Sequence, residues 1–226
     1  MQYDVKLMKT TGWAQRWQNT IRHRALQSLL TLAMLMTAMT AHSAPKTVLV
    51  LGDSLSAEYG LARGSGWVAL LEQRLQQEKI SAVIVNASIS GETTIGGKTR
   101  LPALLAQHHP AVVVIELGAN DALRGLQLNA SKANLQAMID LARQNKAKVL
   151  LIGMQIPPNY GPDYTTKFTQ MFPAAAKQNK VALVPFLLKD VADKPELFQA
   201  DRLHPLAQAH PTILNNVWPQ LQPLLK

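Results

Sequence analysis

Four short polar segments of this sequence contain residue types that can carry nucleophilic catalysis. They are Gly52–Ser56 (GDSLS), Asn86–Gly91 (NASISG), Gly118–Asp121 (GAND) and Asp201–Pro205 (DRLHP). Cleavage of an ester by a serine needs an exposed hydroxyl, a base that takes its proton, a group that orients the base, and donors for the developing oxyanion. The four segments together contain every one of these groups.

Each group of such a reaction has a candidate residue. Ser54 comes after an apolar run and a glycine, at a turn that would expose its hydroxyl. His204 is the candidate base, and Asp201, three residues earlier, can hold the imidazole while Nε2 points at Ser54. The side-chain amide of Asn120 and the backbone N–H groups of Ser54 and Gly91 are candidate donors to the oxyanion. This chemistry needs no metal and no cofactor, so we expect neither.

Each segment alone also has an ordinary structural interpretation. Gly-Asp-Ser after a strand is typical of a turn that caps a helix, and Gly118–Asp121 is compatible with another Asx-rich turn. Asp-x-x-His is compatible with helix capping beside a surface histidine, and Gly91 with a plain turn glycine. The joint occurrence of all four segments, each following a predicted strand, favours a catalytic site over four unrelated turns.

Five apolar runs predict the strands that position these segments. They are Thr47–Leu51, Ala82–Asn86, Ala111–Leu117, Val149–Met154 and Ala182–Phe186. Their near-continuous Val, Ile and Leu content is typical of strands buried on both faces of a parallel sheet. Between and after these runs lie three apolar stripes at helical spacing, the last of which we expect to kink or break at Pro219. The stripes are Trp67, Leu70, Leu71 and Leu75; then Leu135, Met138, Ile139 and Ala142; then Ile213, Leu214, Val217, Trp218, Leu221, Leu224 and Leu225.

This alternation predicts an α/β fold with three layers, α/β/α, and right-handed crossovers. In such sheets ligands bind beyond the carboxyl ends of the strands, where the four polar segments begin.

The four segments resemble the four motif blocks of the SGNH, or GDSL, hydrolase family. The flanking stretches LGDSLSAEYGL, RLPALL, ELGANDALRGL and MQIPPNYG are similar to one subgroup, the bacterial periplasmic acyl-thioesterase, lysophospholipase and arylesterase enzymes. The resemblance implies a flavodoxin-like fold with a central parallel five-stranded sheet. It also implies a triad of Ser54, Asp201 and His204, with an oxyanion hole from Ser54, Gly91 and Asn120. Ala119 departs from the subgroup, which often has glycine there.

Two loops are expected to bind the acyl part of a small-molecule ester or thioester. Leu123 and Leu126 follow Asn120, while Ile156, Pro157 and Tyr160 follow the fourth strand; these apolar side chains would border Ser54. The alternative is that they only cover the edge of the sheet. A carbohydrate O-acetylesterase on the same fold is the main functional alternative.

A nucleotide-binding interpretation rests on Gly91–Thr99. This stretch nearly matches the phosphate-binding pattern Gly-x4-Gly-Lys-Thr. The register fails, because Glu92 stands five residues before Gly97, where the pattern requires glycine, and its charge would oppose phosphate.

Two further interpretations use the same polar segments differently. A metal-dependent hydrolase would take Asp53, Asn120, Asp121 and His204 as ligands, but it leaves Ser54 without a role. A non-catalytic acyl- or glycan-binding protein on this fold would be expected to lack Ser54 or His204, and both are present.

The amino-terminal region predicts export. Basic residues at Arg22 and Arg24 precede an apolar run from Ala25 to Met39, which at about 15 residues is typical of a signal peptide rather than a membrane span. We expect residues 1–44 to be a signal peptide with a long basic leader and residues 45–226 to be the hydrolase domain of a periplasmic or secreted protein.

Composition limits the partners. The chain has no cysteine and a net charge of +9 without a basic run or stripe, so nucleic acid is not expected as a partner. We expect a monomer with some affinity for lipid surfaces. His108, His109 and His210 have no partner motif, which predicts that they lie at the surface.

Overall fold

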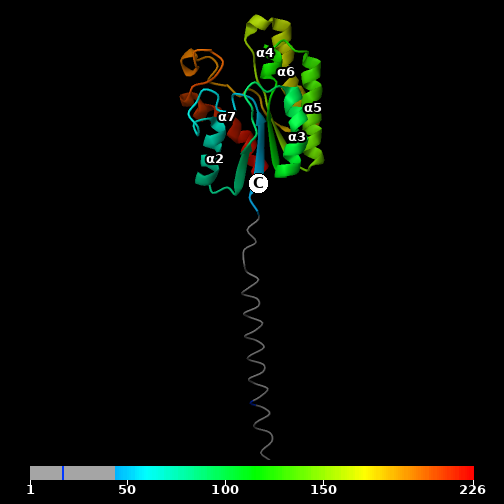
Figure 1. Cartoon of the computed structure of the whole chain (residues 1–226), viewed down its shortest axis with the longest axis vertical. Coiled ribbons are helices and arrows are strands. Elements are labelled where there is room, and N and C mark those ends of the chain that lie inside the picture. Colours follow the sequence, from blue (N-terminus) through cyan, green and yellow to red (C-terminus); the bar gives the residue numbers. More distant parts are fainter. Residues whose placement is uncertain (1–16, 18–43) are drawn as a thin grey trace, which may run out of the picture. The chain divides into compact units, whose positions relative to one another are not determined.

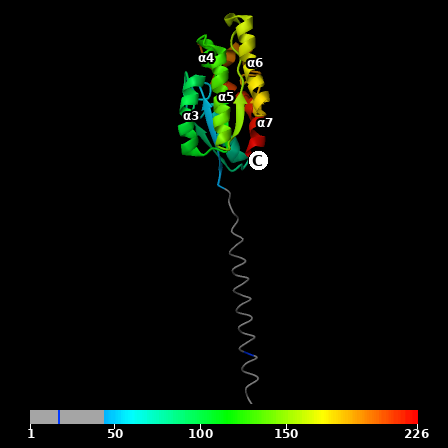
Figure 2. The ribbon, with the colours of Figure 1, turned by 90° about the vertical axis from the view of Figure 1, so that its right-hand side faces the viewer.

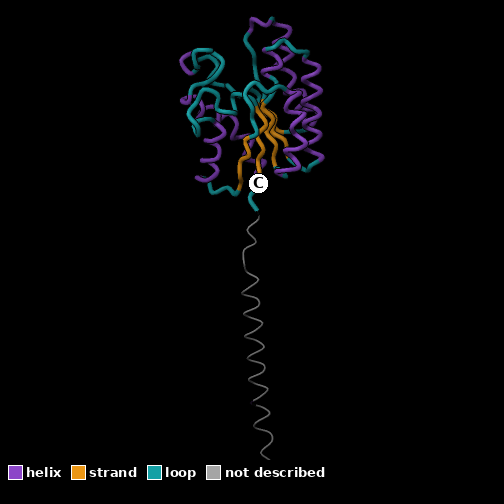
Figure 3. Tube along the Cα trace, viewed as in Figure 1, coloured by secondary structure: helices purple, strands orange, loops and turns teal. Residues whose placement is uncertain are grey.

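The computed structural model describes residues 44–226 and, before them, Trp17 alone. Its five strands are β1 (Lys46–Gly52), β2 (Ala82–Asn86), β3 (Val112–Glu116), β4 (Lys148–Ile152) and β5 (Ala182–Val184). They form one sheet in the order β2-β1-β3-β4-β5, and every neighbouring pair is parallel (Figure 1, Figure 3). The predicted fold is therefore confirmed. The signal-peptide prediction concerns residues that lie almost entirely outside the described ones.

Helices cover both faces of the sheet. The helices are α2 (Trp67–Gln77), α3 (Thr94–His108), α4 (Ala119–Leu123), α5 (Leu128–Gln144), α6 (Pro162–Asn179) and α7 (His210–Leu221), with 3-10 turns η1 (Pro158–Tyr160), η2 (Pro195–Leu197), η3 (Ala207–Ala209) and η4 (Gln222–Leu225). α2 packs with α7 on one face, and α5 packs between α3 and α6 on the other (Figure 1, Figure 2). The chain changes faces because the strand order reverses between β1 and β3, and crossovers between parallel strands are as a rule right-handed. No helix in the described part of the chain has the length and apolar character to cross a bilayer.

The three central strands, β1, β3 and β4, are the most deeply buried part of the core. All five residues of β3 are buried, and so are the last five of β1 and the last four of β4. The outer strands β2 and β5 are only partly buried, because each has a neighbour on one side alone. Burial on both faces was therefore predicted correctly for the central strands and wrongly for the two at the edges.

Three features differ from the helical patterns read in the sequence. α3 and α6 were not predicted, and each contains an internal proline, Pro102 and Pro173. Of the predicted kink or break at Pro219, the break was wrong, because α7 continues to Leu221 before η4 begins. Proline removes one helical hydrogen bond, but buried apolar side chains on the same helices stabilise them enough to keep them continuous.

His210 was also predicted wrongly as a surface residue. Its side chain is 2% exposed, and its Nδ1 accepts a hydrogen bond from the backbone N–H of Trp67 at 2.9 Å. Burial lowers the pKa of His210, with a smaller opposing contribution from the Pro205 carbonyl and the charge of Glu58. The imidazole therefore helps to join the first residues of α2 and α7.

The segment that resembles a phosphate-binding loop is mostly helix. Gly96 and Gly97 lie inside the first turns of α3, where the Thr93 side chain caps the helix. A Cβ at Gly97 would lie 2.3 Å from Leu117 Cδ1. Gly97 therefore allows α3 to approach the sheet closely, which explains this glycine without a phosphate.

Candidate active site

The segment after β1 positions Ser54 at the carboxyl edge of the sheet. A series of turns follows β1 instead of a helix, with hydrogen bonds from Ala57 N–H to Asp53 O (3.0 Å) and from Tyr59 N–H to Ser54 O (3.3 Å). α2 begins only at Trp67. Ser54 is partly exposed between two buried neighbours, Asp53 and Leu55, so its hydroxyl is accessible while its backbone is fixed.

The loop that carries Asp201 and His204 is held by hydrogen bonds of its own. The Asp201 Oδ1 atom accepts the backbone N–H groups of Leu203 (2.9 Å) and His204 (3.0 Å). Gln199 N–H donates to His204 O at 2.8 Å, which closes the loop. Arg202 adopts a left-handed conformation with φ of 58° at the tip of this turn. The three-residue spacing thus brings the carboxylate and the imidazole side by side.

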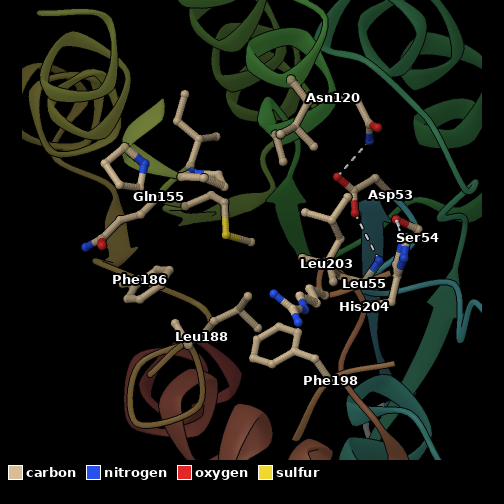
Figure 4. A pocket seen from close by; sticks show the side chains of 18 residues that line it. Asp53, Ser54, Leu55, Asn120, Gln155, Phe186, Leu188, Phe198, Leu203 and His204 are labelled. Carbon is tan, nitrogen blue, oxygen red and sulfur yellow. Dashed lines mark hydrogen bonds between the residues drawn. The ribbon is translucent and has the colours of Figure 1, made fainter. Parts of the chain in front are cut away.

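Ser54, His204 and Asp201 form a continuous chain of hydrogen bonds. His204 Nε2 lies 2.9 Å from Ser54 Oγ (Figure 4). His204 Nδ1 lies 2.7 Å from Asp201 Oδ2. Desolvation raises the pKa of Asp201, but hydrogen bonds from His204 and Leu203 together with the charge of His204 outweigh it and lower this pKa to about 2. Asp201 is therefore ionised at neutral pH, which favours the proton on Nδ1 and leaves Nε2 to accept from the hydroxyl. The ring of Tyr59, which the sequence did not single out, packs on the imidazole with centroids 4.3 Å apart.

Asn120 lies in the first turn of α4, directly after β3, on the pocket wall that also carries Ser54. Its Nδ2 donates to Asp53 Oδ2 at 3.1 Å (Figure 4). It also donates to the Glu92 carbonyl at 3.1 Å. Gly91 has a φ of 79°, and its carbonyl accepts from Arg124 Nη2 at 2.8 Å. In this geometry both amide hydrogens of Asn120 are already engaged.

A pocket of about 450 Å³ opens beside Ser54 and His204. Of the residues predicted to bind an acyl chain, Leu123, Ile156 and Pro157 line it. Leu126 and Tyr160 are not among the lining residues. The Tyr160 hydroxyl instead donates to the Leu123 carbonyl at 3.1 Å, so it ties the two loops together.

The opposite wall of this pocket was missed in the sequence. It consists of mostly apolar side chains that follow β5, namely Phe186, Leu188, Ala192, Phe198, Arg202 and Leu203 (Figure 4). This stretch has no regular apolar period and no polar motif apart from its last residues, so no signal marked it as part of a binding site.

The four residues considered as metal ligands do not converge. Asp121 turns its carboxylate toward α3 and α5, where it accepts from Thr94 N–H at 2.8 Å and from Ser131 Oγ at 2.9 Å. Asp53 accepts from Leu55 N–H and Asn120. Among the residues that the structure describes, no three His, Cys, Asp or Glu side chains are grouped to hold a metal ion.

Comparison with known proteins shows the family to which this chain belongs. The family model of the GDSL-like lipase/acylhydrolase family matches residues 50–211. The chain belongs to this family. The resemblance read from the sequence is confirmed.

Relatives in this family match over nearly their whole length. Esterase TesA of Pseudomonas aeruginosa is 51% identical over 197 residues, which cover 87% of this chain and 98% of that protein. Thioesterase 1/protease 1/lysophospholipase L1 of Escherichia coli is 42% identical over 81% of this chain and 86% of its own. A crystal structure of TesA superposes with a TM-score of 0.77 at 53% identity, covering 79% of this chain and 99% of that one.

The span matched by the GDSL-like family includes every residue of the candidate site. Ser54, Gly91, Asn120, Asp201 and His204 all fall between residues 50 and 211. The family match thus covers the same four segments that the structure gathers at one edge of the sheet.

Proposed function

We propose that this chain hydrolyses carboxylic esters and thioesters through an acyl-enzyme formed on Ser54. The observation that carries the proposal is the continuous set of hydrogen bonds from Ser54 through His204 to Asp201, next to a mostly apolar pocket. The family and the names of its relatives, which include an esterase and a thioesterase, support the same reaction.

The reaction follows from this geometry. His204 Nε2 takes the hydroxyl proton as Ser54 Oγ attacks the substrate carbonyl carbon, and the tetrahedral intermediate carries a negative oxygen. His204 then returns the proton to the leaving alcohol or thiol, which departs and leaves the acyl group on Ser54. Water, activated by the same imidazole, releases the acid. Asp201 stays ionised and stabilises the imidazolium.

The oxyanion would be bound by the N–H groups of Ser54 and Gly91 and by the Asn120 amide. Because both amide hydrogens of Asn120 are engaged, one has to be shared with or released to the oxyanion. The bond to the Glu92 carbonyl is the one to give up, since a neutral carbonyl is a weaker acceptor than the Asp53 carboxylate. The bond to Asp53 would then hold the amide in place during the reaction.

The pocket favours an acyl chain over a sugar as the group beside Ser54. Its walls are largely apolar, with Leu123 and Ile156 on one side and Phe186 and Phe198 on the other. A carbohydrate O-acetylesterase would need polar groups to bind hydroxyls, and no observation in this pocket favours it. A preference for acetyl esters over medium-chain esters would reverse this choice.

Replacement of Ser54 tests the proposal directly. We expect Ser54→Ala to lower kcat by about three orders of magnitude or more while the protein stays folded. A phosphonate ester should label the wild type at Ser54 and leave Ser54→Ala unlabelled, as read by peptide mass. Ser65→Ala is the matched control, because the Ser65 hydroxyl bonds only its local Ala62 carbonyl. Activity of Ser54→Ala within tenfold of the wild type would refute the assignment.

We also propose that the edge around the pocket touches lipid surfaces that contain ester substrates. Large exposed apolar side chains follow every strand at this edge, namely Tyr59, Ile89, Leu126, Tyr160 and Leu203. Side chains of this kind gain free energy when they enter the interfacial region of a bilayer. We expect Ile89→Ser/Leu126→Ser to reduce co-flotation with phospholipid vesicles, and Val83→Ser, exposed on β2 and away from this edge, to leave it unchanged. Equal flotation of all three proteins would remove this part of the proposal.

Export and a monomeric state complete the proposal. The basic residues and the apolar run before residue 44 support removal of an amino-terminal signal near Ser43 or Ala44. Intact mass of the protein recovered from the periplasm or medium should show a start near these residues, and sedimentation should give one chain per particle. Retention of the full chain in the cytoplasm would contradict the export proposal.

A further inference from the structure

Glu116 is an acid in the middle of the apolar core. It is the last residue of β3, follows four buried aliphatic residues, and is 2% exposed. No ion pair within residues 44–226 involves it. A buried carboxylate without a positive partner is strongly unfavourable, so the group needs either a proton or several donors. The hydrolysis described above gives Glu116 no role.

The carboxyl group of Glu116 lies directly beneath the turn that carries Ser54. Its Oε2 accepts the Ser56 hydroxyl at 2.7 Å and the backbone N–H of Asp53 at 3.2 Å. The indole N–H of Trp67 donates to Ser56 Oγ at 3.2 Å and extends this network. Glu116 fits here because Gly52 has no side chain, since a Cβ at Gly52 would lie 2.7 Å from Glu116 Oε2.

A second buried acid, Asp53, joins Glu116 to the candidate oxyanion donor. Asp53 is 1% exposed; its Oδ1 accepts the Leu55 N–H at 3.0 Å, and its Oδ2 accepts the Asn120 amide at 3.1 Å. Asp53 also lies against Glu116, since its backbone N–H donates to Glu116 Oε2 and its charge raises the pKa of Glu116. Two buried negative charges in contact are strongly unfavourable, which favours one of the two groups as a neutral acid.

The surroundings decide which group holds the proton. Burial raises the pKa of Glu116 well above its usual range, and the charge of Asp53 adds to that effect. Burial also raises the pKa of Asp53, to about 6, but the Leu55 N–H, the charge of His204 and the hydrogen bonds of Glu116 and Asn120 oppose the rise. Burial and the charge of Asp53 thus favour the proton on Glu116, whereas the donors around Asp53 favour its anion.

We propose that Asp53 and Glu116 share one proton and act as positioning residues for Asn120. Neutral Glu116 fixes Asp53, and anionic Asp53 holds the Asn120 amide beside Ser54 in the orientation that meets the oxyanion. The inference rests on the oxyanion role of Asn120 in the proposed function. It adds two residues that act through Asn120 without contact to the substrate.

The shared proton can be tested in the wild-type protein. Carbon-13 NMR of labelled carboxyl groups should show a Glu116 signal that stays in the neutral-acid range from pH 5 to pH 8, while the Asp53 signal changes with a midpoint near pH 6. Glu116→Gln identifies the first signal by its loss, and Asp53→Asn identifies the second. An ionised Glu116 at pH 7 would overturn the proton sharing, independently of whether Asn120 binds the oxyanion.

The positioning role is tested by kinetics. Glu116→Leu removes the hydrogen bonds to Ser56 and Asp53, so we expect it to lower kcat by roughly tenfold or more, whereas Glu116→Gln, which keeps a neutral hydrogen-bonding group of similar size, should recover most of that loss. Asp53→Asn should lower kcat by roughly tenfold or more with little change in KM, and should cause no further loss in an Asn120→Ala background, because residues that act as one unit are not additive. Full additivity of the two losses would overturn the positioning role.

The failure of each idea has its own signature. If Asn120→Ala alone keeps wild-type activity, the oxyanion role in the proposed function fails, while the NMR titration still decides on the shared proton. If Asp53→Asn does not fold, Asp53→Glu takes its place and is measured alone and together with Asn120→Ala. A loss of kcat in the double variant that equals the two single losses combined would again count against the inference.

Discussion

Asp53 should make the stability of this protein fall as the pH rises. Its pKa is raised from 3.8 to about 6, chiefly by burial. A carboxyl group whose pKa is higher in the folded state binds its proton more tightly there, so it contributes stability below pH 3.8 that is lost as the pH rises through about 6. One pKa unit corresponds to about 1.4 kcal/mol, so the rise from 3.8 to about 6 gives a loss of about 3 kcal/mol in the free energy of unfolding.

Asp53→Asn removes the ionisation while keeping the size of the side chain. The variant has a fixed cost of its own, because an amide at this position cannot accept from both Leu55 N–H and Asn120 as the carboxylate does. That cost does not depend on pH. We therefore expect the stability of the variant relative to the wild type to improve with rising pH, by up to about 3 kcal/mol and mostly between pH 4 and pH 7. Loss of the Asp53 charge also lowers the pKa of Glu116, but burial, which is the main cause of that raised pKa, is unchanged in the variant.

Urea unfolding of both proteins at several pH values between 4 and 8 measures this difference. The pH dependence of groups distant from Asp53 is common to the two proteins and cancels in the comparison. Asp163→Asn, which changes an exposed carboxylate on α6, is the control and should run parallel to the wild type. If the Asp53→Asn curve also runs parallel to the wild type from pH 4 to pH 8, then Asp53 is not a buried anion and the electrostatics assigned to this site are wrong.

Three further predictions concern catalysis and the loops around it. Asn120→Ala should lower kcat by roughly 10²–10³ with a smaller change in KM, because the amide acts on charge that develops in the transition state; a loss confined to KM in steady-state kinetics would make it a substrate-binding residue. In a panel of p-nitrophenyl esters, kcat/KM should rise about three- to fourfold per added methylene until the pocket is full, and Leu123→Ala or Phe186→Ala should flatten the rise; an unchanged slope would place the acyl chain elsewhere. Gly60→Ala should lower both Tm and kcat, because Gly60 has a φ of 70° and a Cβ there would lie 2.2 Å from Gln199 Oε1. Gly64→Ala is the control, since its φ is also positive but no atom lies within 4 Å, so this variant should lose only the roughly 1–2 kcal/mol of stability that the left-handed conformation costs. Equal losses in the two variants would show that the contact with Gln199 does not matter.

Much of the site was predictable because parallel strands end at one edge. The apolar runs of β1 and β3 are nearly continuous, and the polar residues Ser54 and Asn120 follow them directly. Once the strands are recognised, their carboxyl ends must be neighbours, and the side chains that follow must meet. Asp201 and His204 were predictable for a more local reason, since a three-residue spacing in a tight turn places both groups on one side.

The remaining parts depend on packing that leaves no period in the sequence. The far wall of the pocket, from Phe186 to Leu203, is irregular chain whose apolar side chains meet only in the folded protein. α3 contains Pro102 and two glycines, and its apolar spacing is therefore broken, although Gly97 is there to let the helix approach Leu117. Glu116 fell inside the predicted strand Ala111–Leu117 and was not singled out, and only its hydrogen bonds to Ser56 and Asp53 reveal its position beneath the turn.

The reversal of strand order explains why acids and catalytic groups occur together here. β1 and β3 are adjacent, yet the chain leaves β1 toward α2 on one face and reaches β3 from α3 on the other, so a crevice opens beyond their carboxyl ends. Gly52 and Glu116 are paired across these two strands, which sets the carboxyl group of Glu116 at the base of the crevice. Ser54 lies two residues beyond Gly52, and Asn120 lies four beyond Glu116. The register that brings Ser54 and Asn120 to one edge of the sheet therefore also places Asp53 against Glu116, and the proposed shared proton would make that contact tolerable.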